Sequence, residues 1–298
     1  MNRIRAKNTS QFTLSIVLSF LLIAIPASAT VIRHDRTDAD MLKIGERFEA
    51  VCRVIPDGSC TLIAESWVIT AAHVARSIRE GSEIRIGDAS YKVKRVIVHP
   101  DGTGPPGRPP EVDLALVELA EKVKGVSPIP VYNGDSELGK TLYIVGYGDF
   151  GNAHSALTRM DGKRRAVTNK VDDAGPRRIF MKFDEPPSGT EYEGVGGPGD
   201  SGGPALIEKD GKIYVAGVSS GSMNGKPGKY GVVDVYTRVG SYIKWIEESM
   251  NASATDSATD SESHSSVRML FNRETIIAAV PGWSSRFKGF ADSLIKDH

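Results

Sequence analysis

The sequence is poor in several features that would point to particular classes of protein. It holds only two cysteines in 298 residues, which excludes a disulfide-dense miniprotein and a zinc site built from four thiolates. Its 37 Lys and Arg residues are balanced by 37 Asp and Glu residues, so neither a basic nucleic-acid-binding surface nor an acidic shell is indicated. With 40% apolar and 25% charged residues, the composition is that of a globular protein rather than a disordered chain.

The sequence also lacks an apolar run long enough to span a membrane. Its longest such run, Phe12 to Ile25, has 14 residues, whereas a membrane-spanning helix needs about 20. Three cations precede the run, and the pattern Ala27-Ser28-Ala29 follows it. This order predicts a signal peptide over residues 1–29 and export to an oxidising compartment, either outside the cell or in the periplasm. We expect no stable membrane insertion once the signal has been removed.

Between Thr30 and about Met250, short apolar segments alternate with Gly, Pro, Asn and Asp residues. Many short segments of this kind predict an all-β domain over residues 30–250. Only the end of the domain has helical spacing, which predicts a closing helix, at Val239, Tyr242, Ile243, Ile246 and Met250. Residues 251–266 are predicted to be a Ser/Thr/Asp-rich linker, and residues 267–298 a tail with a short amphipathic helix. That helix would either pack on the domain or bind a partner.

Three separated segments carry residues whose chemistry is best considered together. The first runs from Ser66 through apolar and small residues to His73. The second, Glu111 to Leu119, is nearly all apolar apart from Asp113 near its start. The third, Gly199 to Pro204, places Ser201 among glycines. Each segment alone has an ordinary structural explanation, but together they supply an alcohol, an imidazole and a carboxylate.

These three groups suit nucleophilic catalysis. A serine hydroxyl is a weak nucleophile until an adjacent base removes its proton, and a carboxylate that holds the base improves the transfer. Asp113 would be costly to bury without hydrogen bonds, and an imidazole is an obvious donor. Glycines beside Ser201 let the backbone aim amide groups at one point, so the amides of Gly199 and Ser201 are candidates for an oxyanion hole.

The motifs resemble those of the secreted trypsin-like serine peptidases of the chymotrypsin fold, of a bacterial type. The resemblance is carried by Thr70-Ala71-Ala72-His73, Asp113-Leu114-Ala115-Leu116 and Gly199-Asp200-Ser201-Gly202-Gly203-Pro204, in the order His, Asp, Ser. Gly146-Tyr147-Gly148 and Val235 to Val239 also match, and the resemblance covers about Ile32 to Met250.

The resemblance implies two antiparallel β-barrels with the active site in the cleft between them, closed by a C-terminal helix. It implies a serine endopeptidase that hydrolyses protein or peptide substrates through an acyl-enzyme, with no cofactor and no metal. Ser201 would be the nucleophile, His73 the general base and Asp113 its orienting partner. We expect a monomer. The alternative is a catalytically silent binding domain on the same fold, which is disfavoured because none of the three residues is missing.

The cysteines depart from the family pattern. Many members carry a cysteine directly after the histidine, whereas this chain has Val74 there. Cys52 and Cys60 instead flank a turn signal at Pro56, so a hairpin would set them opposite each other. A disulfide between Cys52 and Cys60 is predicted, and the alternative is a pair of buried thiols.

The residues that would choose the substrate are less clear from the sequence. Val195 stands where trypsin has an acidic residue in its specificity pocket, so cleavage after acidic or small residues remains an alternative to cleavage after Arg or Lys. Asp234 matches another position that lines this pocket, and it would either attract a basic side chain or pair with Lys229 or Arg238. Three further residues match the segment that pairs with the substrate backbone: Ser219, Ser220 and Gly221.

Activation in this family commonly uses a new N-terminal amine that pairs with the aspartate beside the serine, here Asp200. Val31 and Ile32 follow the predicted signal site, with no basic residue directly before them. The hypothesis is that signal peptidase, or a second cut near Ile32, frees the amine without a long propeptide.

Overall fold

The computed structural model describes residues 30–56, 58–103 and 110–252. The chain falls into two compact units, residues 1–247 and 248–298, and nearly all described residues belong to the first. The predicted signal peptide and the predicted tail lie outside the described residues, as does the linker apart from residues 251 and 252. In the described part of the chain, no helix has the length and apolar character needed to cross a membrane.

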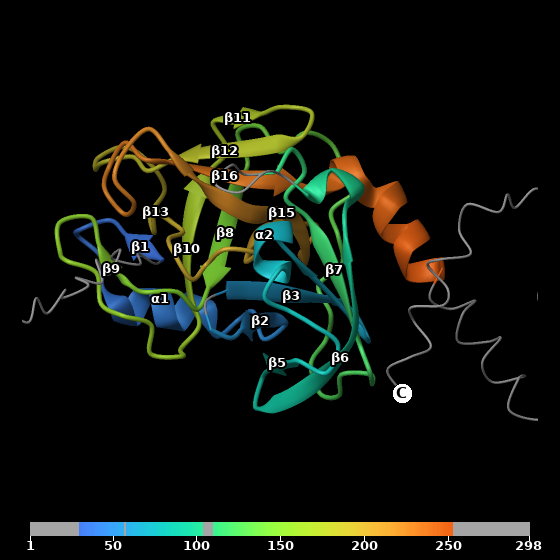
Figure 1. Cartoon of the computed structure of the whole chain (residues 1–298). Helices are drawn as coiled ribbons and strands as arrows, with labels where there is room; N and C mark the ends of the chain where they lie inside the picture. The colour runs from blue at the N-terminus through green and yellow to red at the C-terminus, as the bar shows by residue number, and fades with distance from the viewer. Residues whose placement is uncertain (1–29, 57, 104–109, 253–298) are drawn as a thin grey trace, which may run out of the picture. The chain divides into compact units, whose positions relative to one another are not determined.

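Six antiparallel strands close into a barrel in the order β2-β3-β4-β7-β6-β5 (Figure 1). Their bounds are β2 (Val51–Val54), β3 (Gly58–Ala64), β4 (Trp67–Thr70), β5 (Glu83–Ile86), β6 (Ala89–Val98) and β7 (Ala115–Leu119). Strand β5 alternates exposed and buried residues, as a strand with one face toward the core should. Strand β7 is buried throughout, so both of its faces are covered, and it pairs with β4 on one edge and β6 on the other.

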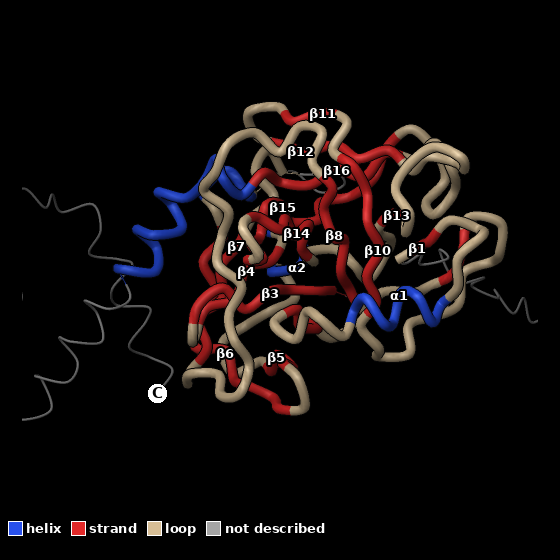
Figure 2. The backbone as a smooth tube through the Cα atoms, turned by 180° about the vertical axis from the view of Figure 1, so that it is seen from behind, coloured by secondary structure: helices blue, strands red, loops and turns tan. Residues whose placement is uncertain are grey.

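A second, larger sheet has seven strands in the order β10-β8-β14-β15-β16-β12-β11 (Figure 2). Their bounds are β8 (Thr141–Gly146), β10 (Arg165–Lys170), β11 (Asp173–Ala174), β12 (Arg178–Lys182), β14 (Pro204–Lys209), β15 (Lys212–Met223) and β16 (Val233–Arg238). The all-β prediction is therefore confirmed. Hydrogen bonds close only the first barrel, whereas the second sheet remains a half-barrel.

The first described residues form the middle strand of a small third sheet. Strand β1 (Val31–Ile32) pairs antiparallel with β13 (Gly194–Val195) and parallel with β9 (Gly151–Asn152). The side chain of Val31 packs with Phe183, Val195 and Val232. The N-terminal segment is thus built into the same region of the chain that leads to Ser201.

Few helices accompany the sheets. Helix α1 (Asp38–Gly45) begins after Thr37, whose hydroxyl caps the helix while Asp40 reaches back to the Thr37 backbone, and it packs against β10. The others are α2 (Ala72–Ala75) and the 3₁₀ turns η1 (Pro100–Gly102) and η2 (Val239–Tyr242). Residues 243–252 are helical, which confirms the predicted closing helix, and its Trp245 contacts the ring of His99 beyond β6.

Candidate active site

Strand pairing brings His73 and Asp113 together. Strand β4 ends at Thr70, which pairs with Ala115 at the start of β7, so the chain after β4 and the chain before β7 leave the barrel at the same edge. His73 lies in the short helix α2 just after β4, and its Nδ1 is 2.7 Å from Asp113 Oδ2. The His73 amide also donates to Asp113 Oδ1 at 2.9 Å. The imidazole is therefore held with its other nitrogen free to accept a proton.

Asp113 is buried but well satisfied. Its carboxylate receives a second side-chain bond, from Ser220 Oγ at 2.7 Å, and its backbone carbonyl receives one from Thr237 Oγ1 at 3.0 Å. Burial alone would raise the pKa of Asp113, but the hydrogen bonds from His73 and Ser220 outweigh it and keep the pKa below its ordinary value. Asp113 is thus held as a carboxylate.

The loop that carries Ser201 is held against the barrel by Ser59, a buried residue of β3. The Ser59 amide donates to the Ser201 carbonyl at 2.8 Å, and the Ser59 hydroxyl donates to the Gly199 carbonyl at 3.1 Å. Gly202 has a φ of 79°, and a Cβ there would collide with Thr70 Oγ1. The Ser201 loop therefore lies tightly on the strands that lead to His73. Within the described residues, the Ser201 hydroxyl itself makes no hydrogen bond.

The two amides predicted for the oxyanion hole, those of Gly199 and Ser201, differ from their neighbours in their hydrogen bonding. The amides of Asp200, Gly202 and Gly203 each donate to a backbone carbonyl, at 2.9, 2.9 and 2.8 Å. The amides of Gly199 and Ser201 have no acceptor in the part of the chain that the structure describes. Gly199 has a φ of 94°, in the left-handed region that favours glycine. Two free donors beside one hydroxyl suit the stabilisation of a developing oxyanion.

A small pocket of about 150 Å³ opens beside Ser201. It is lined by Gly196, Gly197, Pro198, Ser201, Ser219, Gly221, Ser222, Pro227 and Asp234. The predicted substrate-binding residues Ser219, Gly221 and Asp234 thus gather in one place with Ser201. Two others do not join them: Val195 packs in an apolar cluster and pairs with Val31, and the Ser220 side chain bonds to Asp113 instead.

Asp234 is a buried carboxyl in this pocket with few partners. Its Oδ2 accepts from the Gly196 amide at 2.6 Å and from the Tyr236 hydroxyl at 3.4 Å. Burial raises the pKa of Asp234 to about 8. Lys229 donates instead to two backbone carbonyls, and Arg238 pairs with another carboxylate, so the alternative pairing with either cation is wrong. In the described chain, neither Lys229 nor Arg238 neutralises the Asp234 carboxyl group, which lines the pocket.

Asp200 lies next to the first described residue. Its Oδ2 accepts from Thr30 Oγ1 at 2.7 Å and its Oδ1 accepts from the Gly148 amide at 2.8 Å. Thr30 and Asp200 are each 1% exposed, and burial raises the pKa of Asp200 to about 6. Ile32 instead packs in the core of the second sheet. The residue that contacts the Asp200 side chain is therefore Thr30, whereas the Ile32 side chain is packed in the core.

The two cysteines face each other as the hairpin predicts. Cys52 and Cys60 are direct partners in the register of β2 and β3, and their sulfur atoms lie 2.7 Å apart as two free thiols. Burial raises the pKa of the Cys60 thiol well above its ordinary value. The disulfide itself stays a prediction.

The sequence motifs do not include Ser59 and Thr30, two residues that bond to the Ser201 loop. Ser59 carried no signal, because it belongs to no motif and lies far from Ser201 along the chain. Thr30 did carry such a signal, since it directly follows the predicted cleavage site at Ala29.

No group of three or more His, Cys, Asp or Glu side chains suited to a metal ion occurs among the residues that the structure describes.

Comparison with known proteins places these features in a family. The family model described as Trypsin matches residues 55–246, more than half of the chain. Rat complement C1s subcomponent is 30% identical over 229 residues, which cover 65% of this chain and 32% of the relative. Human serine protease 41 is 27% identical, covering 65% of this chain and 68% of the relative, and rat vitamin K-dependent protein C is 28% identical, covering 62% and 44%. The chain thus spans less than half of two of these three relatives.

The fold has a close parallel among solved structures. Neuropsin, a serine protease expressed in the limbic system of mouse brain, aligns with a TM-score of 0.59 and 20% identity, over 70% of this chain and 98% of that one. The relatives named above are mammalian, so the bacterial type stays a prediction. From the family match and the shared chymotrypsin fold, we conclude that this chain belongs to the trypsin family of serine endopeptidases.

Proposed function

We propose that the chain is a secreted serine endopeptidase with Ser201 as its nucleophile. One observation carries the proposal. The His73–Asp113 pair, joined at 2.7 Å, lies at the barrel edge on which the Ser201 loop is held. The free amides beside the Ser201 hydroxyl support the same assignment.

The proposed reaction begins with proton transfer. His73 Nδ1 donates to Asp113, which leaves Nε2 as the acceptor for the Ser201 hydroxyl proton. Ser201 Oγ attacks the carbonyl carbon of the scissile peptide bond, and the oxygen gains negative charge within reach of the two free amides. The carboxylate of Asp113 stabilises the imidazolium that forms.

Collapse of the tetrahedral intermediate breaks the C–N bond. His73 returns its proton to the leaving amine, and the acyl group remains on Ser201 Oγ as an ester. A water molecule then gives its proton to His73 and attacks the ester. Ser201 recovers its hydroxyl and the second product leaves as a carboxylic acid.

Asp234 supports cleavage after Arg or Lys. It is the ionisable residue in the lining of the small pocket beside Ser201, and neither Lys229 nor Arg238 neutralises it. A substrate cation that enters the pocket would find a carboxyl group that no cation of the described chain neutralises and that would ionise when the cation binds. The glycines and serines around it contribute little bulk that would obstruct a long side chain.

Secretion and activation are proposed as one event. Signal cleavage after Ala29 would leave Thr30 as the first residue, and Thr30 is already beside Asp200. The new ammonium would pair with that buried carboxylate, as the family resemblance suggests. N-terminal sequencing of active protein should find Thr30, and a start at Met1 or well beyond Ile32 would contradict this route.

The decisive experiment compares mature protein with its Ser201→Ala variant on a mixed peptide library and with a fluorophosphonate reagent that labels activated serines. We expect both cleavage and labelling to disappear in the variant. Ser241→Ala is the matched control, because its hydroxyl bonds only to the Pro176 carbonyl. Cleavage that persists without Ser201 would rule out this nucleophile. A folded wild-type protein that neither cleaves nor labels would favour a silent binding domain.

A further inference from the structure

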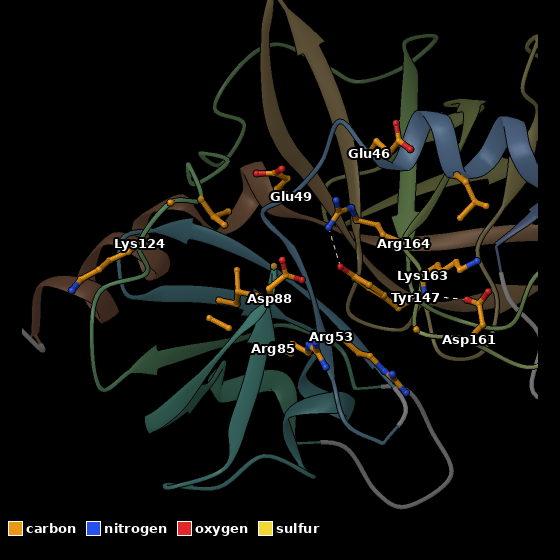
Figure 3. Close-up of a pocket in the computed structure, with 17 residues that line it drawn as sticks. Glu46, Glu49, Arg53, Arg85, Asp88, Lys124, Tyr147, Asp161, Lys163 and Arg164 are labelled. Carbon is orange, nitrogen blue, oxygen red and sulfur yellow. Dashed lines mark hydrogen bonds between the residues drawn. The ribbon is translucent and has the colours of Figure 1, made fainter.

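A second cavity of the described chain shares no lining residue with the small pocket beside Ser201. It has a volume of about 1110 Å³ and is lined by the end of α1, strand β2, the turn between β5 and β6, and loops around residues 124–126 and 161–164 (Figure 3). The family motifs account for none of these lining segments except Tyr147. A volume of this size exceeds that of most sites for a single small molecule.

Two arginines face each other at this cavity. Arg53 of β2 and Arg85 of β5 are direct partners in the register of their antiparallel strands, and Figure 3 shows both side chains extending from neighbouring strands. Like charges placed opposite each other in this way repel. Among the described residues, no carboxylate bonds to either guanidinium.

Arg53 is also incompletely satisfied. Its Nε is buried and has no hydrogen-bond partner within the described chain, while one of its terminal nitrogens donates to the Met160 sulfur at 3.4 Å. A thioether is a weak acceptor, and a buried N–H group without a partner is costly. A carboxylate between the two arginines would remove the repulsion, because a guanidinium presents paired N–H groups that match two carboxylate oxygens.

We propose that Arg53 and Arg85 bind an acidic side chain of a polypeptide substrate, outside the residues at the scissile bond. The proposal rests on the endopeptidase function proposed above. It assigns the large cavity to a stretch of substrate and makes a carboxylate at the arginine pair a determinant of specificity.

The charges around the cavity favour a polypeptide over a polyanion. Besides the arginine pair, Figure 3 shows charged residues of both signs on this cavity, namely the carboxylates Glu46, Glu49, Asp88 and Asp161 and the cations Lys124, Lys163 and Arg164. A sulfated polysaccharide carries charge of one sign only and would be repelled by the carboxylates that lie among these cations. A peptide can place an acidic residue at the arginines and residues of other charge beside the carboxylates.

The cavity adjoins the candidate oxyanion hole. Met160, which contacts Arg53, has its methyl group only 3.0 Å from the position that a Cβ on Gly199 would occupy. Tyr147 lines the cavity and donates its amide to Ser59 Oγ, whose hydroxyl in turn bonds to the Gly199 carbonyl. A substrate whose carbonyl lies at Gly199 and whose one side chain fills the small pocket can therefore extend on its other side toward the arginine pair.

The test uses two fluorogenic peptides that share one cleavage sequence and differ by Glu or Gln residues on the leaving-group side. We expect the wild-type protein to cleave the Glu peptide with a kcat/KM on the order of tenfold higher, because hydrogen bonds between charged groups are worth about that factor. In Arg85→Glu this ratio should fall to about one or below. Hydrolysis of a single-residue chromogenic amide, which reaches only the small pocket, should be unchanged.

Arg79→Glu provides the matched control, since Arg79 is exposed, lies outside the cavity lining and undergoes the same change of charge. An unchanged Glu-to-Gln ratio in Arg85→Glu, with normal amide hydrolysis, would overturn the inference and leave the endopeptidase proposal intact. Loss of all hydrolysis in wild type would instead overturn the proposed function.

Direct binding separates the two proposals further. Calorimetry of the Glu and Gln peptides with the Ser201→Ala variant measures binding without turnover, and we expect the Glu peptide to bind more tightly. This preference should disappear when Arg85→Glu is added to Ser201→Ala. Equal binding of the two peptides would contradict the inference. Tight, Arg85-dependent binding of a sulfated polysaccharide, with no preference between the peptides, would contradict the assignment of a polypeptide as the occupant.

Discussion

At the scale of single residues, Ser59 shows how one residue outside every motif can bond to two backbone carbonyls of the candidate site. Its amide holds the Ser201 carbonyl, and its hydroxyl holds the Gly199 carbonyl. The same hydroxyl accepts from the Tyr147 amide at 3.3 Å, and the Ser59 carbonyl accepts from Thr70 Oγ1 at 2.9 Å. We therefore propose that Ser59 positions the loop that carries the two candidate oxyanion-hole amides.

Replacing Ser59 by alanine should remove the two hydroxyl bonds and keep the backbone bonds. We expect Ser59→Ala to lower kcat on the order of tenfold with little change in KM. Without the bond to its carbonyl, Gly199 would no longer hold its amide in a fixed direction, and this would weaken stabilisation of the transition state more than binding of the substrate. Steady-state kinetics on an amide substrate measure this split, with Ser241→Ala as the control. A rise in KM at constant kcat would contradict the assigned role.

If Asp234 receives the substrate cation as proposed, the binding of cations should depend on pH. Its pKa of about 8 means that the carboxyl is protonated at neutral pH in the free protein, whereas a bound cation favours the carboxylate. Cation binding below pH 8 must therefore release a proton. We expect the Kd of an aromatic amidine to fall by up to about tenfold per pH unit between pH 6 and 8, and to level off above pH 8.

Calorimetry or fluorescence titration across this range measures the effect. Asp234→Asn should bind the amidine weakly and lose the pH dependence, since an amide cannot ionise. A Kd that stays constant from pH 6 to 8 in the unsubstituted protein would show that Asp234 is not the group that receives the cation.

At the scale of elements, strand β1 joins the N-terminal segment to the Ser201 region. Its partner β13 lies a few residues before Ser201, and Thr30 at its start bonds to Asp200. We expect the kcat/KM of a protein that begins at Thr30 to be on the order of a hundredfold higher than that of a protein with a short extension before Thr30. Only the protein that begins at Thr30 has its N-terminal ammonium beside the buried Asp200 carboxylate.

Two such proteins, alike in every later residue, can be compared on the same chromogenic amide. The folded state of each is followed by circular dichroism, so that loss of activity is not confused with unfolding. Equal activity would show that the Asp200 carboxylate needs no ammonium from this segment.

Element pairing also explains what the sequence left open. The apolar segments that contain Asp113 and His73 do not show where their strands begin and end: Asp113 precedes β7, and His73 lies in α2 after β4. Neither boundary is visible locally, because the ends of β4 and β7 are fixed by their mutual register. Val195 was expected in the pocket, yet its place is set by pairing with β1, which no pattern around residue 195 reveals.

At the scale of the whole molecule, the buried carboxyl of Asp234 opposes stability at high pH. An unfolded aspartate has a pKa near 3.8, whereas the folded value is about 8, so the folded state binds more protons between these values. Stability should therefore fall as pH rises from about 4 to about 8, at most by about 1.4 kcal/mol per pH unit from this group. Urea unfolding at several pH values measures this slope, and Asp234→Asn should reduce it.

The general architecture could be predicted, whereas the cavity at Arg53 and Arg85 could not. Short apolar segments with turn residues between them indicate an all-β domain, and the motifs around His73, Asp113 and Ser201 indicate the family. The cavity at Arg53 and Arg85 depends on five segments spread from α1 to residue 164, and its charged lining resembles an ordinary exposed surface when read along the chain. Only the register of β2 and β5 reveals that the two arginines are opposite each other.

The hydrogen bonds on Asp113 have a consequence for the order of synthesis. Its carboxylate and its carbonyl are held by Ser220 and Thr237, which leave the ribosome 107 and 124 residues after it. A growing chain that has already made both His73 and Asp113 therefore still lacks the groups that fix them. We therefore expect the chain to acquire the proposed catalytic geometry only after β15 and β16, which carry Ser220 and Thr237, have been translated.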